Sequence, residues 1–216
     1  MTAGAPPTSM SPAAPPATLL SALASVVDRL DWANIFPETG PVEVELGAGD
    51  GSFLLDLARL HPDRNYLGVE RMLGRLRKLD RKGRRAGLRN IRGLRIEAGY
   101  CLEFLLPLAG AEALHVYFPD PWPKRRHWRR RLVNNRFPAL AGRVLAPGGC
   151  VHLRTDHPAY FAQMREVFAA APRFREVPPP AQIIAVQTDF ERDFSARGIP
   201  TLRASYRHEP AAQAAV

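Results

Sequence analysis

The chain has 216 residues and a formal net charge of +9, from 30 Lys and Arg against 21 Asp and Glu, and its length fits one α/β domain better than two very small ones. Hydrophobic residues make up 46% of it, enough for an ordinary buried core, which argues against wholesale disorder. Cys101 and Cys150 are too few for a disulfide framework or a cysteine-based zinc site, and no apolar run approaches the ~18 residues that a membrane span needs.

The first 18 residues are rich in Ala, Pro, Ser and Thr and carry no charged side chain. Such a segment buries too little apolar surface to order itself, and it lacks the cationic start and continuous apolar stretch of a secretory signal. We therefore expect a disordered tail over residues 1–18, a single domain over 19–208 and a flexible tail over 209–216. Within the domain, the pattern from Leu19 to Leu30 predicts a short helix.

From residue 42 onward, apolar runs alternate with stretches of helical spacing. The predicted strands are Val42–Leu46, Tyr66–Val69, Ile91–Ile96, Ala113–Phe118, Cys150–Leu153 and Thr201–Tyr206. The predicted helices are Gly51–Leu60, a segment through Met72, Leu76, Leu79 and Ala86, then Arg130–Leu145 and Tyr160–Ala170. Repeated β–α units predict an α/β fold with a mostly parallel central sheet, helices on both faces and an antiparallel C-terminal strand. The Arg-interrupted pattern of Ile91–Ile96 suits an edge strand better than a central one.

The positive charge is concentrated in two segments. Residues 71–95 carry eleven Arg or Lys and one acid, and residues 124–131 carry six Arg or Lys and no acid. The rest of the chain holds 13 cations against 20 acids, a net charge of −7. Such blocks are typical of phosphate-binding surfaces, and Trp122 and Trp128 add faces on which bases can stack. For residues 71–95, a solvated outer helix face is the alternative.

Acidic residues stand at the carboxyl ends of five predicted strands. They are Glu45, Glu70, Glu97, Asp120 and Asp156. Ligands of open α/β sheets bind at this edge. The sequence therefore predicts one acid-lined site there.

The loop after the first of these strands reads Glu45-Leu46-Gly47-Ala48-Gly49-Asp50-Gly51 and opens a helix. Its glycines permit a tight turn and a close approach of a ligand to the backbone, and Glu70 follows where an acid accepts hydrogen bonds from ribose hydroxyls. The spacing differs from the dinucleotide fingerprint G-x-G-x-x-G, and Glu45 would repel a pyrophosphate. S-adenosylmethionine fits, since it has a ribose, an adenine and cationic groups but no phosphate. A plain β–α turn is the alternative.

A proline-rich loop follows the fourth core strand and reads Pro119-Asp120-Pro121-Trp122-Pro123-Lys124-Arg125-Arg126-His127. Its three prolines exclude helix and hold Asp120 at the edge of the sheet. With this loop, the sequence resembles the bacterial tRNA (guanine-N7)-methyltransferase family from about Asp31 to Tyr206. The resemblance rests on P-D-P-W-x-K-x-R-H-x-x-R-R from Pro119 to Arg131, on the E-x-G-x-G-x-G loop, on Thr155-Asp156 and on Thr188-Asp189-Phe190-Glu191.

The resemblance implies a cytoplasmic class I methyltransferase of Rossmann-like fold. It would transfer a methyl group from S-adenosylmethionine to N7 of a tRNA guanosine, at position 46 of the variable loop. The implied cofactor-binding residues are Glu45, Gly47, Gly49, Glu70, Glu97 and Asp120, and the implied substrate-binding residues are Lys124, Asp156, Thr188, Asp189, Phe190 and Glu191. The implied RNA-binding residues are Arg126, His127, Trp128, Arg129, Arg130 and Arg131. The family usually has Asp where this chain has Glu97.

Guanine N7 carries a lone pair and no proton, so its methylation does not require a general base. We expect Asp120 to be the catalytic residue by orienting the reactants and stabilising the positive charge that the ring acquires. Glu191 would accept hydrogen bonds from the guanine edge, while Phe190 would pack on the base or fill the core. His127 would pair with phosphate or cap the following helix. The His residues show no metal-ligand spacing, so we expect no metal.

Two alternatives from other classes stay open at this point. A class I methyltransferase of small molecules explains the glycine loop but leaves both basic segments without a role. A non-catalytic RNA-binding protein explains the charge but not the five acids at the strand ends. Oligomeric state, monomer or homodimer, is open as well.

Overall fold

The computed structural model describes residues 17–209. The predicted tails therefore fall outside the described residues, except for Ala17, Thr18 and Glu209. The Thr18 hydroxyl donates a 3.0 Å hydrogen bond to Asp80 Oδ1, which also accepts from the backbone N–H of Leu19 at 2.7 Å. The predicted boundary between the tail and the domain lies between Thr18 and Leu19, the two residues that bond to Asp80.

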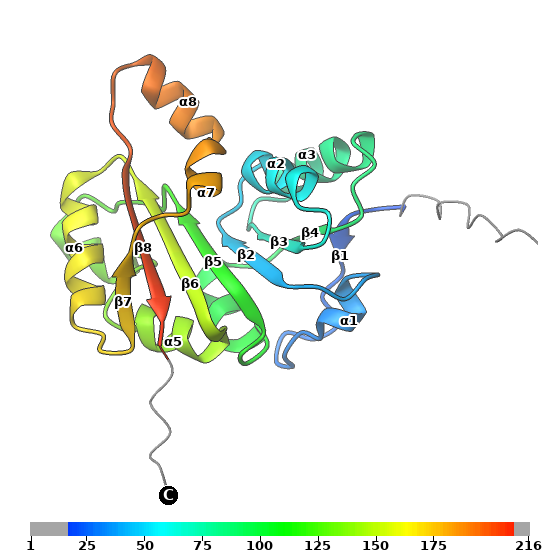
Figure 1. Cartoon of the computed structure of the whole chain (residues 1–216), viewed down its shortest axis with the longest axis horizontal. Helices are drawn as coiled ribbons and strands as arrows, with labels where there is room; N and C mark the ends of the chain where they lie inside the picture. The colour runs from blue at the N-terminus through cyan, green and yellow to red at the C-terminus, as the bar shows by residue number, and fades with distance from the viewer. Residues whose placement is uncertain (1–16, 210–216) are drawn as a thin grey trace, which may run out of the picture.

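A single sheet of eight strands runs through the described residues. Its order is β1 (Leu20–Ser21), β4 (Ile91–Leu94), β3 (Asn65–Val69), β2 (Val42–Leu46), β5 (Ala111–Tyr117), β6 (Leu145–Thr155), β8 (Leu202–His208) and β7 (Phe174–Val177). The pairs from β1 to β6 are parallel, whereas β8 (the red arrow in Figure 1) pairs antiparallel with both β6 and β7. The predicted mostly parallel sheet with an antiparallel C-terminal strand is confirmed.

Helices cover both faces of the sheet, and the sheet separates two hydrophobic cores. One face packs against α1 (Trp32–Ile35), α4 (Ala98–Tyr100), the π-helical turn η1 (Cys101–Leu105), α5 (Phe137–Val144) and α6 (Pro158–Ala169). The other face packs against α2 (Ser52–Leu60), α3 (Leu73–Arg85) and α7 (Ala181–Ala185). Helix α8 (Asp189–Ala196) stands past the end of the sheet, at the top of Figure 1.

Strand β2 makes the two faces chemically different. Its residues alternate, so that Val42 and Val44 enter the first core while Glu43 and Glu45 turn to the second face. There Glu43 Oε2 lies 2.8 Å from Nε2 of His115, a residue of β5. The second face therefore carries buried polar side chains, of which Glu45 lies toward the carboxyl end of β2.

The helix predicted from Leu19 to Leu30 is wrong, because this segment begins with strand β1, which pairs in parallel with β4. Leu19 is buried against Gly83 of α3, where an added Cβ would meet the Leu19 side chain at 2.5 Å. The packing of Leu19 onto a glycine thus outweighs local helical spacing. As a consequence, β4 is not at the edge of the sheet.

The helix predicted from Arg130 to Leu145 is also wrong in its first half. Residues Arg125–Arg130 form a 3₁₀ helix (η2), Arg131 is extended, and α5 begins only at Phe137. Arg131 turns its side chain inward and is buried, so the chain cannot continue as an exposed basic helix. Across residues 17–209, none of the helices combines the length and the apolar character required to cross a lipid bilayer.

Candidate functional site

Two adjoining hollows lie at the carboxyl ends of the parallel strands. The larger, which we call the acidic pocket, has a volume of about 520 Å³ and is lined by three of the predicted acids, Glu70, Glu97 and Asp120. The smaller, which we call the inner pocket, has a volume of about 210 Å³ and lies beside Glu45. Both are lined by Gly47, Arg75, Tyr117 and Phe118. The structure therefore brings four of the five predicted strand-end acids together.

The glycine loop takes a conformation that its glycines make possible. Gly47, Gly49 and Gly51 all have positive φ, at 93°, 58° and 76°. A Cβ on Gly51 would lie 2.5 Å from Leu79 Cδ1 of α3, so the loop also packs closely on that helix. Glu70 braces the loop, since its Oε2 accepts a 3.1 Å hydrogen bond from the Gly49 N–H.

Glu45 is the most perturbed acid of the site. Its side chain is 3% exposed, and Oε2 has no hydrogen-bond partner among the described residues. Burial raises the pKa of this carboxyl well above its usual range, although the nearby charge of Arg154 opposes the shift. A buried acceptor without a partner is costly, and it suits a ligand that brings an N–H donor.

Glu97 and Asp120 lie at the more open side of the acidic pocket. The Glu97 carboxylate caps helix α4 by accepting hydrogen bonds from the N–H groups of Gly99 and Tyr100, at 2.9 and 2.7 Å. Asp120 is exposed, and its loop passes through two residues with positive φ, Phe118 at 49° and Trp122 at 43°. Positive φ is unfavourable for residues other than glycine, so contacts elsewhere in the loop have to stabilise this conformation.

Arg131 anchors the proline loop, by which we mean Pro119–Arg131. Its side chain is 1% exposed; Nε donates a 2.7 Å hydrogen bond to the Pro121 carbonyl, and Nη1 donates to the Gln163 side chain. Its guanidinium also lies 4.5 Å from the ring centroid of Trp128 and 4.6 Å from that of Tyr160. The prediction that Arg131 contacts RNA is therefore corrected: the side chain faces the protein and holds the loop.

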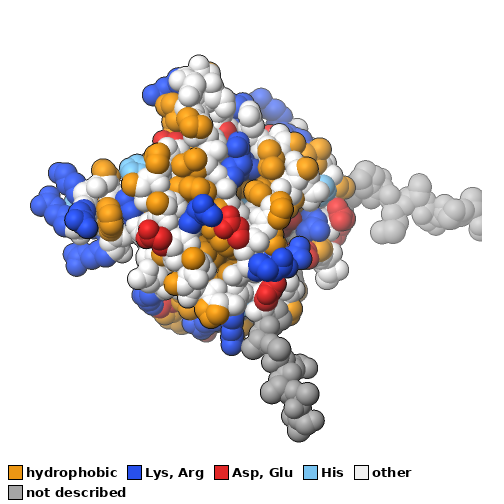
Figure 2. Space-filling view, turned by 60° about the vertical axis from the view of Figure 1, so that its left-hand side comes forward, with side chains coloured by type: hydrophobic (Ala, Val, Ile, Leu, Met, Phe, Trp, Pro, Cys, Tyr) orange, Lys and Arg blue, Asp and Glu red, His pale blue; other side chains and the backbone are white. Residues whose placement is uncertain are grey.

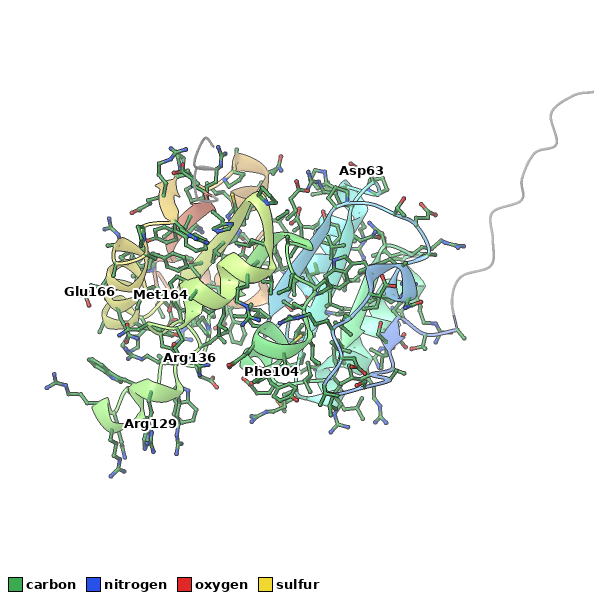
Figure 3. All side chains as sticks on the ribbon, turned by 90° about the horizontal axis from the view of Figure 1, so that it is seen from below. Asp63, Phe104, Arg129, Arg136, Met164 and Glu166 are labelled. Carbon is green, nitrogen blue, oxygen red and sulfur yellow. The ribbon has the colours of Figure 1, made fainter. Side chains whose placement is uncertain are left out.

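The remaining predicted RNA-binding cations stay on the surface. Arg126, Arg129 and Arg130 are exposed, and the guanidinium of Arg130 lies 5.1 Å from the ring centroid of Trp122, which lines the acidic pocket. His127 and Trp128 are half-buried. Arg129 stands on a part of the loop that projects from the body (Figure 3), and Lys and Arg side chains gather at the left margin of Figure 2.

The α7–α8 segment, residues 181–196, closes the inner pocket. Thr188 and Glu191 form a capping box at the start of α8, with hydrogen bonds of 3.1 and 3.0 Å between side chain and backbone. Phe190 is 49% exposed at the pocket wall, and its ring centroid lies 5.9 Å from that of Phe118. Phe190 is therefore not a core residue, and Asp189 lines the pocket beside it.

Glu191 does not face either pocket. It is 0% exposed, its Oε2 pairs with Arg154, and its Oε1 accepts a 2.8 Å hydrogen bond from Arg203. With both oxygens engaged inside the protein, it anchors α8 instead of reading a guanine edge, which corrects the expectation from the sequence. Lys124 and Asp156 line neither pocket.

Arg154 and a small polar network were missed from the sequence. Arg154 is buried on β6, donates to the carbonyls of Val186 and Ile183 and to Glu191, and so ties the α7–α8 segment to the sheet. Lys82 Nζ donates to Asp50 Oδ2 at 2.6 Å and to Ser52 Oγ at 2.9 Å, which joins α3 to the glycine loop. The alternation of polar and apolar residues in Val151–Thr155 was the available signal for Arg154.

No group of three or more His, Cys, Asp and Glu within residues 17–209 is arranged to hold a metal ion. Of the two cysteines, Cys101 is buried and Cys150 half-buried, and neither lines the two pockets. Burial raises the pKa of the Cys101 thiol to about 12.

Comparison with known proteins agrees with this geometry. The profile of a family described as putative methyltransferase matches residues 39–204. The tRNA (guanine-N(7)-)-methyltransferase of Halorhodospira halophila is 34% identical over 188 residues, which cover 84% of this chain and 80% of that protein. The one of Geobacillus kaustophilus is 34% identical and covers 77% and 79%. The one of Thermotoga maritima is 32% identical over 78% of this chain, which spans about half (51%) of that longer protein.

Two solved structures share the fold. The 16S rRNA methyltransferase KamB superposes with a TM-score of 0.60 at 19% identity, over 83% of this chain and 93% of that one. TrmN from Thermus thermophilus superposes with a TM-score of 0.56 at 21% identity, over 79% and 44%. The predicted Rossmann-like methyltransferase fold is thereby confirmed.

Proposed function

The chain belongs to the tRNA (guanine-N7)-methyltransferase family, and we propose that it transfers a methyl group from S-adenosylmethionine to N7 of a guanosine in tRNA. Position 46 in the variable loop is the proposed target. One observation carries the proposal: a pocket lined by carboxylates at the strand ends adjoins an inner pocket beside Glu45, and basic side chains border the two.

The residues of the site suit S-adenosylmethionine. Glu45 Oε2 is a buried acceptor without a partner, which matches the donors on the cationic amino acid part of this molecule. Glu70 and Glu97 would accept from the ribose hydroxyls and from the adenine amino group, respectively. Cations also line the two pockets, with Arg75 shared by both and Lys78 at the inner pocket, so the case for S-adenosylmethionine rests on the donors that Glu45, Glu70 and Glu97 can accept from.

When bound, S-adenosylmethionine supplies an electrophilic methyl group on a cationic sulfur. The chain's own contribution is to hold guanine N7 in line and close to that methyl group, which replaces a bimolecular encounter by a prearranged one. The guanine ring becomes cationic on methylation, and the exposed carboxylate of Asp120 stabilises this charge. No side chain has to remove a proton from N7.

The target base has to leave its helix to reach the site. The major groove of A-form RNA is deep and narrow, and base-modifying enzymes commonly flip their target out of the stack. Phe118 and Phe190 at the inner pocket offer ring faces for such a base. Thr188 and Asp189 are the polar groups beside it. Lys124 and Asp156 would act on the neighbouring nucleotides.

Exposed cations of the proline loop would bind the RNA backbone. Arg126, Arg129 and Arg130 are exposed, Arg130 lines the acidic pocket, and Trp128 and His127 lie among them in the chain. Arginine side chains pair with phosphates in a bidentate manner. The site would therefore combine strand-end carboxylates that accept from a cationic cofactor with exposed cations that bind the polyanionic substrate.

The direct test incubates the protein with S-adenosylmethionine labelled in its methyl group and with bulk tRNA that lacks 7-methylguanosine. Label in 7-methylguanosine after digestion to nucleosides supports the proposal. Label only in small molecules would point to a different methyltransferase, and tRNA binding without transfer would point to a non-catalytic RNA-binding protein. In the same assay, D120N that bound both substrates and kept full turnover would overturn the role of Asp120.

A further inference from the structure

A third hollow, which we call the basic groove, lies between α2, α3 and α8 with a volume of about 310 Å³. Its lining includes five cationic residues, Arg59, Arg81, Lys82, Arg85 and Arg192, against two acidic ones, Asp56 and Asp189. Four of the five cations are exposed. This is a concave surface of strongly positive charge, distinct from the proline loop.

The cations of the groove fall into two groups. Three of them are already paired within the protein: Arg59 with Asp56 at 2.6 Å, Lys82 with Asp50 at 2.6 Å, and Arg192 with Asp189. Within residues 17–209, no side-chain hydrogen bond or ion pair engages the guanidinium groups of the other two, Arg81 and Arg85, which lie one turn apart on α3. These two guanidinium groups are available to a ligand.

The basic groove is continuous with the inner pocket. Ser52 and Asp189 line both, and the Ser52 hydroxyl donates a 2.8 Å hydrogen bond to Asp189 Oδ2 across the boundary. The inner pocket in turn adjoins the acidic pocket, whose other side carries Arg130 of the proline loop. The basic groove, the inner pocket and the acidic pocket thus adjoin one another in this order, with Arg81 and Arg85 in the first and Arg130 in the last.

We propose that the basic groove binds backbone phosphates of the RNA strand next to the target guanosine. The proposal rests on the function proposed above and extends it by a second RNA contact. A strand whose base enters the inner pocket carries its neighbouring phosphates within reach of the adjoining groove, because consecutive phosphates are joined by one nucleotide. Arg81 and Arg85 supply the guanidinium groups that pair best with such oxygens.

Charge complementarity favours RNA over other occupants. The groove offers donors and few apolar side chains, with Leu55 as its only aliphatic lining residue among those described. Lys82 and Arg192 already have partners, since Lys82 joins α3 to the glycine loop and Arg192 pairs with Asp189 within α8. Arg81 and Arg85 would therefore supply the binding energy, and the cations that are paired within the protein would shape the groove.

The test compares two double variants that remove the same charge from the same helix. R81A/R85A removes the unpaired cations of the groove, whereas R77A/R84A removes two exposed cations of α3 that do not line it. We expect R81A/R85A to weaken tRNA binding about tenfold at moderate salt and to lower the slope of log affinity against log salt by about 1.5, the equivalent of two phosphate contacts. R77A/R84A should change the slope by less than half of that, and both variants should keep wild-type affinity for S-adenosylhomocysteine.

Phosphate-ethylation interference locates the contact. Ethylation of phosphates within a few nucleotides of the methylated guanosine should block binding of the wild type, and R81A/R85A should lose sensitivity at those positions. Equal slopes for the two double variants, or unchanged interference at these phosphates, would overturn the proposal for the groove. If the wild type formed no 7-methylguanosine at all, the proposed function itself would fail, so that the two failures are distinguishable.

Discussion

Two arginines anchor the two chain segments that flank the site, and they do so by different means. Arg154 ties the α7–α8 segment to the sheet through a buried ion pair with Glu191 and through the carbonyls of Ile183 and Val186. Arg131 holds the proline loop through neutral acceptors and through the rings of Trp128 and Tyr160. Both side chains are buried. Arg131 is expected from the sequence among the RNA-binding cations, whereas the sequence predicts no role for Arg154.

The difference predicts different costs of removal. Deleting Arg154 leaves the fully buried Glu191 with Arg203 alone as its cationic partner, and a buried charge that loses one of its two partners is expensive. Deleting Arg131 leaves only neutral groups without a donor, and these can turn to water or shift.

R154M should have the largest effect, a loss of about 3–5 kcal/mol in the free energy of unfolding, because it strands the buried carboxylate of Glu191. Urea denaturation measures it. The control is R165M, which removes an exposed partner of Glu176 and should cost less than about 1 kcal/mol. The double variant R154M/E191Q should recover part of the loss; an effect of R154M no larger than that of R165M would contradict the account of the ion pair.

R131M should cost less, about 1.5–3 kcal/mol, the range for hydrogen bonds from a charged donor. It should also slow methyl transfer on the order of tenfold to a hundredfold, since the loop that carries Asp120 loses its anchor. The salt dependence of tRNA binding should stay at its wild-type slope. A reduced slope would instead make Arg131 a phosphate contact, as the sequence first indicated.

E45Q should stabilise the protein without ligand above pH 4.5 and leave its stability unchanged well below that pH. The Glu45 carboxyl has a raised pKa in the folded protein, so it keeps its proton at pH values where the unfolded chain has already lost it. The free energy of unfolding of the wild type therefore falls as pH rises from the unfolded pKa to the folded pKa. E45Q has no carboxyl at this position and does not show this loss. Urea titrations at pH 3 and pH 8 measure the difference. The same variant should bind S-adenosylhomocysteine more weakly. A lower free energy of unfolding for E45Q than for the wild type at pH 8 would contradict this explanation.

R129A/R130A should have the smallest effect on stability, within about 0.5 kcal/mol, because both side chains are exposed. Its effect should appear in RNA binding, with a salt slope lower by about 1 to 2. Fluorescence anisotropy with labelled tRNA at several salt concentrations measures this slope. An unchanged slope would remove the proline loop from the RNA surface.

Most of the fold and the acidic pocket could be predicted from the sequence, because strand β2, its glycine loop and the acids at the strand ends are local patterns. The burial of individual charged side chains could not be predicted. Nothing in residues 124–131 distinguishes Arg131 from Arg130, and only the packing against Tyr160 and Gln163, from helix α6, does so. Glu191 misled in the same way, since its partners Arg154 and Arg203 come from distant strands.

The central claim is tested most directly by locating the methyl group on a single tRNA. An unmodified transcript with guanosine at position 46 is incubated with the protein and S-adenosylmethionine, then reduced and cleaved with aniline, which breaks the chain at 7-methylguanosine. We predict one cleavage at position 46, and none in a transcript with adenosine there. Cleavage at another guanosine would contradict the proposed target, and methylation without any aniline-sensitive site would contradict transfer to N7.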